Sequence, residues 1–446
     1  KIDSPTTHGL ETKFPQSTHL REKSHAAIPG GAHTYSKGDD QFPEQAPGFI
    51  LRGKGCHVWD VDGNEFIEYG MGLRSVTLGH AYESVVEAAH QQMLLGCNFT
   101  RPAKIELDYA EDLLTVLSNA DMVKFAKNGS DVTTAAVKLA RAYTGRDLVA
   151  LCEDHPFFSV DDWFIGHTQL NAGIPQAIRD LTISFRFNDL DSVKSLFERH
   201  KNQIACIILE PATAEEPKHD FLVRLKELCD AEGSLLILDE MITGFRWHLK
   251  GAQAVYGVVP HLATFGKAMS NGFALAALAG RRDIMELGGL RHPRERVFLL
   301  STTHGAETHA LAAAWETLNV YRRCNVIEHL YQQGERLRAR IAQVISRHRV
   351  GEHFAVLGRA CNLIYATKDA AGQRSQPFRT LFLQEMIRGG VIAPSFVVSF
   401  SHSEEDIDRT VDACDKALGV YAKALQDGVE KYLVGRPVRP VDRKFN

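Results

Sequence analysis

The chain is 446 residues long and carries 51 basic and 55 acidic side chains, which give a formal net charge of −4. Its composition, 44% hydrophobic and 24% charged, is that of a soluble globular protein and excludes a disordered or fibrous chain, and no apolar run approaches the roughly 20 residues that span a bilayer. Because charges of both signs are interspersed, no basic face for nucleic acid or a membrane surface is expected, and we predict a small-molecule ligand.

The predicted elements divide the chain into a large and a small domain, because 446 residues exceed what a single core usually holds. The stretch IPGGAHTYSKGDDQFPEQAPG, at residues 28–48, is rich in turn-forming residues. We expect residues 1–75 to be an N-terminal segment that joins the small domain. Residues 76–325 should form the large, ligand-binding domain, and residues 326–446 the rest of the small α+β domain.

The large domain has the pattern of βαβ units. From about residue 120 to 285, short apolar runs that end in polar residues alternate with helical patterns, which predicts a mostly parallel central sheet flanked by helices. The predicted segments are a turn and helix at 126–146, a strand at 203–211, a helix at 221–233, strands at 234–240 and 274–280, helices at 306–320, 326–347 and 404–424, and short strands at 359–367 and 390–393.

Three polar residues stand at the ends of apolar runs: Glu210, Asp239 and Lys267. Because ligands collect beyond the carboxyl ends of parallel strands, Asp239 and Lys267 should face one crevice. Lys267 has no other lysine or arginine within thirteen residues on either side, which favours the neutral, nucleophilic form of its amine. A purely structural ion pair is the alternative. Glu210, followed by proline, could equally end a strand and orient its neighbours.

A turn of small residues precedes the helix predicted at 126–146. Gly129 allows close backbone approach, Ser130 offers a hydroxyl, and the amides of a helix N-terminus favour an anion such as phosphate. The alternative is that Ser130 or Asp131 only caps the helix. A phosphate seat, a carboxylate and a lysine on one sheet are what pyridoxal 5'-phosphate requires, since its aldehyde forms a Schiff base with lysine and its ring nitrogen needs an acidic partner.

Several ordered motifs between about residues 20 and 425 resemble the class III, fold-type I aminotransferases, closest to the glutamate-1-semialdehyde aminomutase branch. The motifs are IPGG (28–31), VWDVDGNEFIEY with LGH (58–80), GSDVTTAAVKLARAYTGR (129–146), LILDEMITGFR (236–246) and ATFGKAMSNG (263–272).

The resemblance implies a role for each matching residue. Lys267 corresponds to the Schiff-base lysine, Asp239 to the acid that faces the pyridine nitrogen, and Gly129 with Ser130 to the phosphate-binding turn. Met241 corresponds to an apolar side chain on one face of the ring. Thr303 corresponds to a threonine that reaches the phosphate of the neighbouring subunit's cofactor, which implies a homodimer with shared active sites.

The sequence departs from the family where a Tyr-His-Gly motif would cover the other ring face. Here it has CEDHPFFSVDDWF (152–164). Aligning Asp162 and Trp163 with the family's Asp-Trp places Phe157 on the stacking position and Phe158 on the histidine, although a slip of one residue would exchange them. Ordinary core packing of both phenylalanines is the alternative.

Amino transfer between a donor and a keto or aldehyde acceptor is the function that the resemblance favours. The intramolecular amino shift of the aminomutase is the second candidate, but the aminomutase's carboxylate-binding arginine is replaced by Lys37, which lacks a bidentate fork. Arg74 or Arg246 could take that role, or each could be an exposed or ion-paired arginine.

Polar residues expected near the mouth of the site favour a hydroxylated, sugar-like acceptor, although a polar loop needs no substrate to explain it. They are His33, Tyr35, Lys37, Asp39, His304 and Glu307. A catalytically silent, regulatory protein of the same fold is a further alternative. No metal-ligand spacing and no nucleotide-binding motif is found. The eight cysteines show no C-x-x-C pair, and the first residues lack an apolar signal core, so we expect a cytoplasmic protein, although a first residue of lysine leaves room for a removed leader.

Overall fold

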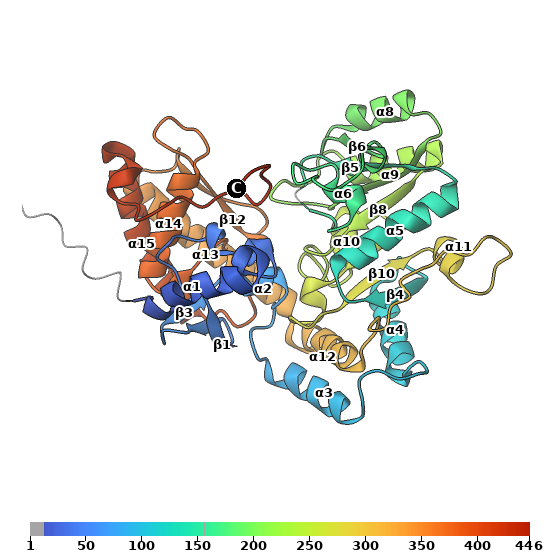
Figure 1. Ribbon diagram of the computed structural model, residues 1–446, viewed down its shortest axis with the longest axis horizontal. Coiled ribbons are helices and arrows are strands. Elements are labelled where there is room, and N and C mark those ends of the chain that lie inside the picture. The colour runs from blue at the N-terminus through green and yellow to red at the C-terminus, as the bar shows by residue number, and fades with distance from the viewer. Residues whose placement is uncertain (1–12, 156) are drawn as a thin grey trace, which may run out of the picture. The chain divides into compact units, whose positions relative to one another are not determined.

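The computed structural model describes residues 13–155 and 157–446, which fall into two compact units (Figure 1). Unit 1 comprises the described residues up to Met71, together with Leu78–Tyr82 and Glu328–Arg443. Unit 2 comprises Gly72–Thr77, Glu83–Ile327 and Lys444–Asn446. The domain boundaries that we placed at residues 75 and 325 stay a prediction.

Unit 2 is built on a seven-stranded sheet of order β4-β10-β9-β8-β7-β5-β6. Strand β10 is antiparallel to both of its neighbours, and every other pairing in the sheet is parallel. The predicted α/β fold with a mostly parallel central sheet is therefore confirmed. The strands are β4 (Met122–Ala126), β5 (Leu148–Cys152), β6 (Thr182–Phe185), β7 (Ile204–Leu209), β8 (Leu235–Asp239), β9 (Leu262–Phe265) and β10 (Ala276–Gly280).

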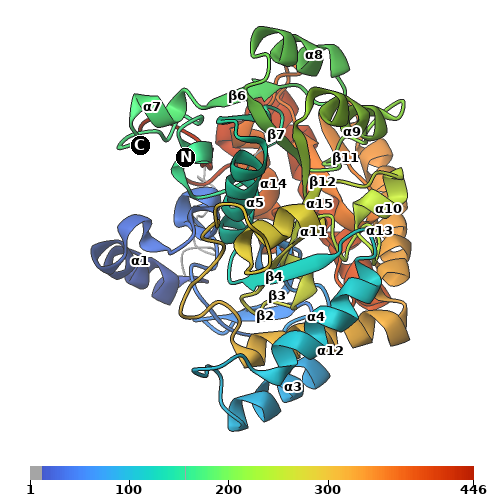
Figure 2. The same ribbon diagram turned by 90° about the vertical axis from the view of Figure 1, so that its right-hand side faces the viewer.

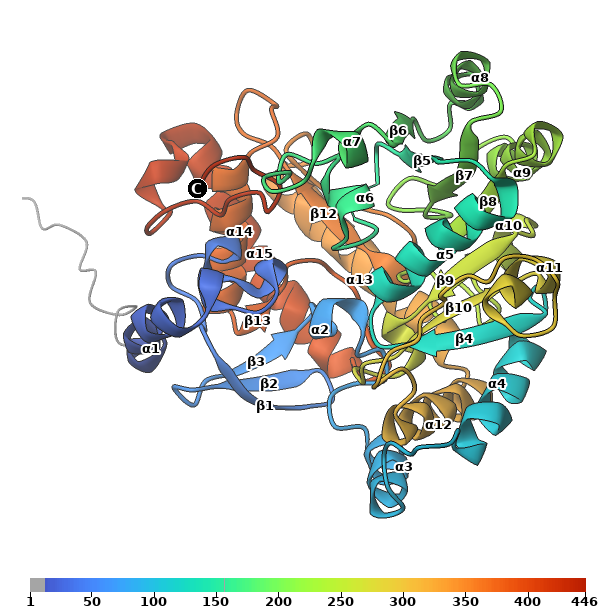
Figure 3. The same cartoon turned by 45° about the vertical axis from the view of Figure 1, so that its right-hand side comes forward.

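Helices cover both faces of this sheet (Figure 3), as the alternating side chains of β8 illustrate. Leu235 and Ile237 pack in a core cluster with the apolar face of α5 (Gly129–Thr144). Leu236 and Leu238 pack in a second cluster with α8 (Leu190–Arg199) and α9 (Phe221–Glu232). Since strand side chains alternate, Asp239 at the end of β8 lies on the same face as α5.

The remaining helices of unit 2 surround the sheet, and α3 and α4 each pack against α12 below it (Figure 2). Within the described residues, no helix is long and apolar enough to cross a bilayer. These helices are α3 (Glu83–Leu94), α4 (Lys104–Val116), α6 (Asp162–Ile165), α7 (Gln176–Arg179), α10 (Ala252–Tyr256), α11 (Arg282–Met285), α12 (Thr308–Cys324), η4 (Lys267–Met269) and η5 (Glu286–Gly288), together with α2 (Met71–Arg74), whose first residue is counted in unit 1.

Unit 1 combines the N-terminal and C-terminal parts of the chain, as expected for the smaller α+β domain. Strands β1, β2 and β3 form antiparallel pairs, β13 adds to β3 in parallel, and β11 pairs with β12. The strands are β1 (Ile50–Lys54), β2 (His57–Asp60), β3 (Glu65–Glu68), β11 (Phe354–Leu357), β12 (Ile364–Thr367) and β13 (Val391–Ile392). The helices are α1 (Pro15–Ala27), α13 (Val326–His348), α14 (Gln376–Arg388), α15 (Glu404–Asp427), η1 (Pro29–Gly31), η2 (Tyr35–Lys37), η3 (Asp39–Gln41), η6 (Ala360–Asn362) and η7 (Val429–Lys431).

Candidate functional site

Lys267 lies directly after strand β9, where the chain turns into η4. Its backbone is in the left-handed region, with a φ of 46°. Its amine Nζ donates a hydrogen bond to the carbonyl oxygen of Leu73 at 2.9 Å. Burial, with the nearby charge of Arg74 as the second cause, lowers the pKa of Lys267 to about 8. A substantial fraction of this amine is therefore neutral near pH 8, which makes it a nucleophile.

Asp239 ends the neighbouring strand β8 and is 3% exposed. Its Oδ1 accepts two hydrogen bonds, from the backbone N–H of Met241 at 3.0 Å and from the hydroxyl of Thr264 at 3.1 Å. Within residues 13–155 and 157–446, no donor reaches its Oδ2. Burial raises the pKa of Asp239 to about 6, so the carboxylate is mostly ionised at neutral pH and keeps one oxygen for a ligand N–H.

The N-terminus of α5 opens beside these two residues. Asp131 caps the helix start by accepting from the backbone N–H of Asn128 at 2.9 Å, whereas the hydroxyl of Ser130 accepts from the backbone N–H of Val160 at 3.0 Å. Of Ser130 and Asp131, the two residues considered as caps of this helix, Asp131 is therefore the one whose side chain makes the capping hydrogen bond. The hydroxyl proton of Ser130 can still donate to an anion.

Met241 connects the helix start to the lysine turn. A Cβ on Gly129 would lie 2.8 Å from the Met241 methyl carbon, and a Cβ on Gly266 would lie 2.2 Å from it. The Met241 side chain therefore lies against both glycines, and a Cβ at either position would have to displace its methyl group. Lys267, Asp239, Gly129 and Met241 consequently belong to one site.

The two phenylalanines in the segment 152–164, where the sequence differs from the family motif, have different environments. Phe158 is 2% exposed and packs its ring edge-on against Phe164 at 5.6 Å, as part of the core. Phe157 is 50% exposed, and its ring packs edge-on against that of Phe164, with 5.5 Å between the ring centroids. Core packing accounts for Phe158, while Phe157 keeps a ring face that a ligand can reach, and its stacking role stays a prediction.

Glu210 and Arg74 add two further ionisable groups to the site. Glu210 is 6% exposed, and its backbone N–H donates to Nδ1 of His155 at 3.0 Å. Burial, reinforced by the charge of Asp239, raises the pKa of Glu210 to about 8, while the charges of Arg74 and Lys267 oppose this rise. Burial, reinforced by Arg246, lowers the pKa of Arg74 to about 10.

Arg74 closes a left-handed turn, α2, in which Met71, Gly72, Leu73 and Arg74 have φ values of 44°, 58°, 57° and 70°. This conformation costs a non-glycine residue roughly 1–2 kcal/mol, and such strain clusters at functional sites. Arg246 is 1% exposed and donates to the Arg74 carbonyl at 3.3 Å and to the Thr77 hydroxyl at 2.8 Å. Of the two alternatives to a substrate role for Arg246, an exposed or an ion-paired arginine, burial rules out the exposed one, because its backbone and hydroxyl acceptors lie inside the unit.

The Glu210→Gln variant is expected to reduce the dependence of stability on pH. Between the ordinary carboxyl pKa of 4.5 and the value of about 8 in the fold, the folded state keeps a proton that the unfolded chain releases, so wild-type stability falls as pH rises. Glutamine cannot titrate. In thermal unfolding of cofactor-free protein, the melting temperature of the variant minus that of wild type should grow up to about pH 8 and then level off. A difference that shrinks over this range would contradict the assignment.

The other predicted residues of unit 2 lie around the start of α12. Glu307 forms ion pairs with Lys127, with His304 at 3.1 Å and with His309 at 3.6 Å, and the hydrogen bond from Lys127 holds its pKa below the usual value. The Thr303 carbonyl accepts from the Asn98 side chain at 3.0 Å. Thr303 also lines an open cavity of about 600 Å³.

The predicted polar residues of the N-terminal stretch belong to unit 1. Lys37 ends η2 and is exposed, and Tyr35 is 64% exposed. Asp39 pairs with Arg21 at 3.4 Å and with His25 at 3.1 Å. The substrate-binding role of Lys37 stays a prediction.

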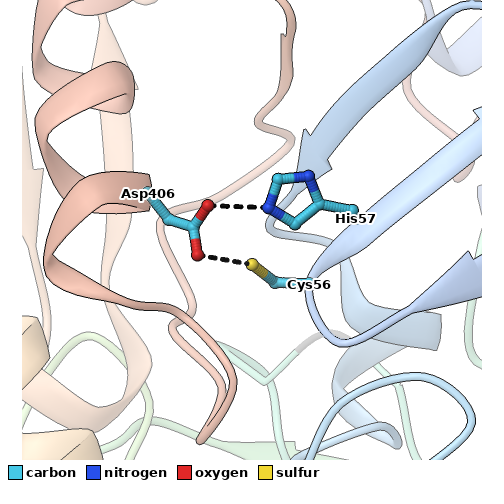
Figure 4. A group of neighbouring side chains, drawn as sticks. All are labelled: Cys56, His57 and Asp406. Atoms are coloured by element: carbon cyan, nitrogen blue, oxygen red, sulfur yellow. Dashed lines mark hydrogen bonds and ion pairs between the residues drawn. The ribbon is translucent and has the colours of Figure 1, made fainter.

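Unit 1 also contains a cluster of three potential metal ligands, Cys56, His57 and Asp406 (Figure 4). Asp406 lies in the first turn of α15, where Oδ1 binds His57 Nε2 at 2.7 Å and Oδ2 accepts from the Cys56 thiol at 3.2 Å. Oδ2 also accepts from the backbone and the hydroxyl of Ser403 at 2.9 and 2.8 Å. Because four donors already satisfy this carboxylate, helix capping explains the cluster and we assign no metal to it.

Comparison with known proteins places the chain in a family. The family model for class-III aminotransferases matches residues 40–418, and the chain belongs to this family. The glutamate-1-semialdehyde 2,1-aminomutases of Francisella philomiragia and Persephonella marina are 31% and 30% identical to it. Each alignment covers 90% of this chain, and 97% and 98% of the relative, respectively.

Solved structures of similar fold include the PLP internal aldimine form of the FumI protein of Sphingopyxis sp. MTA144. It has a TM-score of 0.83 at 27% identity, over 93% of this chain and 98% of that one. A glutamate-1-semialdehyde aminomutase from Pseudomonas aeruginosa PAO1 has a TM-score of 0.81 at 19% identity, over 92% and 96% of the two chains. The fold is that of the fold-type I, PLP-dependent transferases.

Proposed function

We propose that this protein is a pyridoxal-phosphate-dependent aminotransferase that moves an amino group between a small amino donor and a keto or aldehyde acceptor. The observation that carries the proposal is the pairing of the low-pKa amine of Lys267 with the buried carboxylate of Asp239 on adjacent strand ends. Membership of the class III family makes a catalytically silent protein the poorer alternative.

The residues present fit the cofactor. Asp239 keeps Oδ2 for a ring N–H, Gly129 and Ser130 present a helix start to a phosphate, and Met241 and Phe157 offer apolar surface to a ring. When bound, pyridoxal phosphate supplies an aldehyde that condenses with amines and a ring that accepts the electrons of a broken C–H bond.

The side chains would then divide the work between them. The neutral amine of Lys267 would hold the cofactor and, when not attached to it, would carry a proton between carbon atoms. The negative charge of Asp239 keeps the ring nitrogen protonated. Arg74, whose guanidinium stays protonated below its lowered pKa of about 10, binds a carboxylate of the substrate, and Glu210, whose pKa is raised to about 8, is mostly the neutral acid at neutral pH and leaves that positive charge to the substrate.

The polar residues from which we inferred a sugar-like acceptor give little support to that substrate. His304 and Glu307 already pair with each other, and Asp39 already pairs with Arg21 and His25. Assays of the loaded enzyme with a panel of amino donors, followed by detection of the amine formed on keto sugars, keto acids and aldehydes, test both the reaction and the acceptor class. No amine product with any acceptor would overturn aminotransferase activity.

The intramolecular amino shift is the second candidate, because the two curated relatives compared above are named glutamate-1-semialdehyde 2,1-aminomutases. Lys37 in place of the arginine argues for transfer between two molecules. Incubation with glutamate-1-semialdehyde alone separates the two candidates. Conversion to 5-aminolevulinate without an added amino donor or acceptor would favour the aminomutase.

We propose that the protein is a homodimer and that it works in the cytoplasm, where its cysteines stay reduced. Within the described residues, no disulfide forms. Large apolar side chains are exposed around the end of α3 and on α4, close to the loop of Thr303: Met93, Leu94, Leu95, Phe99 and Leu107 are 51 to 73% exposed. A second copy of the chain would cover this patch and bring Thr303 towards the cofactor of the partner.

The double variant Leu94→Asp with Leu95→Asp should therefore dissociate the dimer. Charges buried in the interface cannot be solvated, so light scattering after size exclusion should show the monomer mass, with an activity loss of about tenfold or more. Leu290→Asp, at a site that is 81% exposed outside the patch, serves as the matched control and should stay dimeric. A dimeric double variant would contradict the predicted interface.

A further inference from the structure

The segment Gly72–Thr77 touches Lys267 through one backbone atom, the carbonyl oxygen of Leu73, which accepts from Nζ at 2.9 Å. Its conformation therefore decides whether the lysine amine has an acceptor at this point. Leu73 and Arg74 are left-handed without being glycine, with φ values of 57° and 70°. Neither side chain favours that region, so contacts from elsewhere in unit 2 must impose it.

The strongest of these contacts come from Arg246, in the turn that follows β8. Its Nη2 donates to the Arg74 carbonyl at 3.3 Å and to the Thr77 hydroxyl at 2.8 Å, so it spans the second half of the segment. The Thr77 hydroxyl also hydrogen-bonds the phenol of Tyr321, and that phenol donates to the carbonyl of Ala268, next to Lys267, at 2.7 Å.

These bonds form a closed path from Arg246 to the lysine. One branch runs through the turn to the Leu73 carbonyl, and the other runs through Thr77 and Tyr321 to the backbone beside Lys267. Arg246 is 1% exposed. Burying a guanidinium is costly, and the two hydrogen bonds that its Nη2 donates to one segment offset part of that cost.

We propose that Arg246 is a positioning residue for Lys267, which holds Gly72–Thr77 in the left-handed turn that presents the Leu73 carbonyl to the lysine amine. The inference rests on the proposed function, because the position of this amine matters only if Lys267 is the reacting group. Arg246 acts through the turn, and the same turn fixes the backbone of Arg74, from which that side chain reaches the site.

The test measures the amine itself in cofactor-free, full-length protein. Competitive acetylation across pH, read by mass spectrometry of the Lys267 peptide, gives the midpoint at which the amine becomes reactive, with exposed Lys250 as the internal reference. In wild type the midpoint should lie at about 8. Arg246→Met should raise it partly because the charge of Arg246 is itself one of the lesser causes of the low value, and both Arg246→Met and Arg246→Lys should raise it because burial is the largest cause and a loosened turn admits water.

In the loaded enzyme, both substitutions should lower kcat by about 10- to 100-fold with a smaller change in KM, since a misplaced reacting group loses rate more than binding. Arg246→Lys keeps the positive charge, so a wild-type midpoint and kcat in this variant would mean that only charge matters and would overturn the proposal. Leu73→Gly added to Arg246→Met should restore part of the loss, because glycine adopts the left-handed turn unaided. No restoration would equally overturn it.

If the Arg246 variants fail to fold, Thr77→Val removes one acceptor and leaves the arginine in place. It should raise the acetylation midpoint by less than Arg246→Met is expected to, and an unchanged midpoint would contradict the positioning role. The acetylation profile requires no turnover. Absence of amino transfer in wild type would therefore refute the proposed function while leaving this measurement able to decide the role of Arg246.

Discussion

Lys267→Ala should abolish amino transfer, with kcat/KM reduced by about 10⁴-fold, which is the upper range for loss of an acid–base group. The variant removes the single amine that both attaches the cofactor and moves the proton. The backbone of residue 267 is already left-handed at a φ of 46°, so alanine keeps some strain but adds no bulk. Turnover of each candidate donor by wild type and variant gives the comparison.

Two controls separate chemistry from folding in this experiment. Because burial disfavours the charged amine, the wild-type lysine costs stability below about pH 8, and cofactor-free Lys267→Ala should melt no lower than wild type at neutral pH. Lys250→Ala removes an exposed lysine from the same unit and should keep wild-type activity. Retention of more than about a tenth of wild-type kcat/KM by Lys267→Ala would refute the assignment of Lys267.

Asp239→Asn should lower kcat by about 10²- to 10³-fold while the cofactor still attaches to Lys267, because a neutral amide cannot hold a proton on the ring nitrogen. The substitution is nearly isosteric. The carboxamide oxygen can keep the hydrogen bonds from the Met241 N–H and the Thr264 hydroxyl, so the turn after β8 should stay intact. Stopped-flow measurement of the first half-reaction isolates the affected step.

Asp191→Asn is the matched control for this change of charge, since its side chain is 94% exposed on α8. It should behave as wild type. If Asp239→Asn retains kcat within about twofold, the carboxylate has no electronic role and the function of this site must be assigned differently.

The positions of Lys267 and Asp239 could be predicted because their strands carry clear signals. The runs LATF and LLILD are apolar enough to be buried strands, and the residues at their ends are polar. The structure gives β9 and β8 at these places, adjacent and parallel. The antiparallel direction of β10 could not be predicted, because an apolar run carries no information about the direction of the strand.

The left-handed turn at Met71–Arg74 could not be predicted either. Only Gly72 in this segment has a sequence signal for positive φ, whereas Leu73 and Arg74 reach it through contacts with residues about 170 or more positions away. The acceptor for the lysine amine was missed for the same reason. Thr264, which donates to Asp239, lies within the apolar run LATF that precedes Lys267, and no feature of the sequence marks it as part of the site.

The most direct test of the lysine assignment is reduction of the cofactor-saturated protein with sodium borohydride, followed by peptide mapping. A pyridoxyl group should be found on Lys267, at close to one per chain, and should be absent from Lys267→Ala. Cofactor-saturated protein that carries no such group, or carries it on another lysine, would contradict the account.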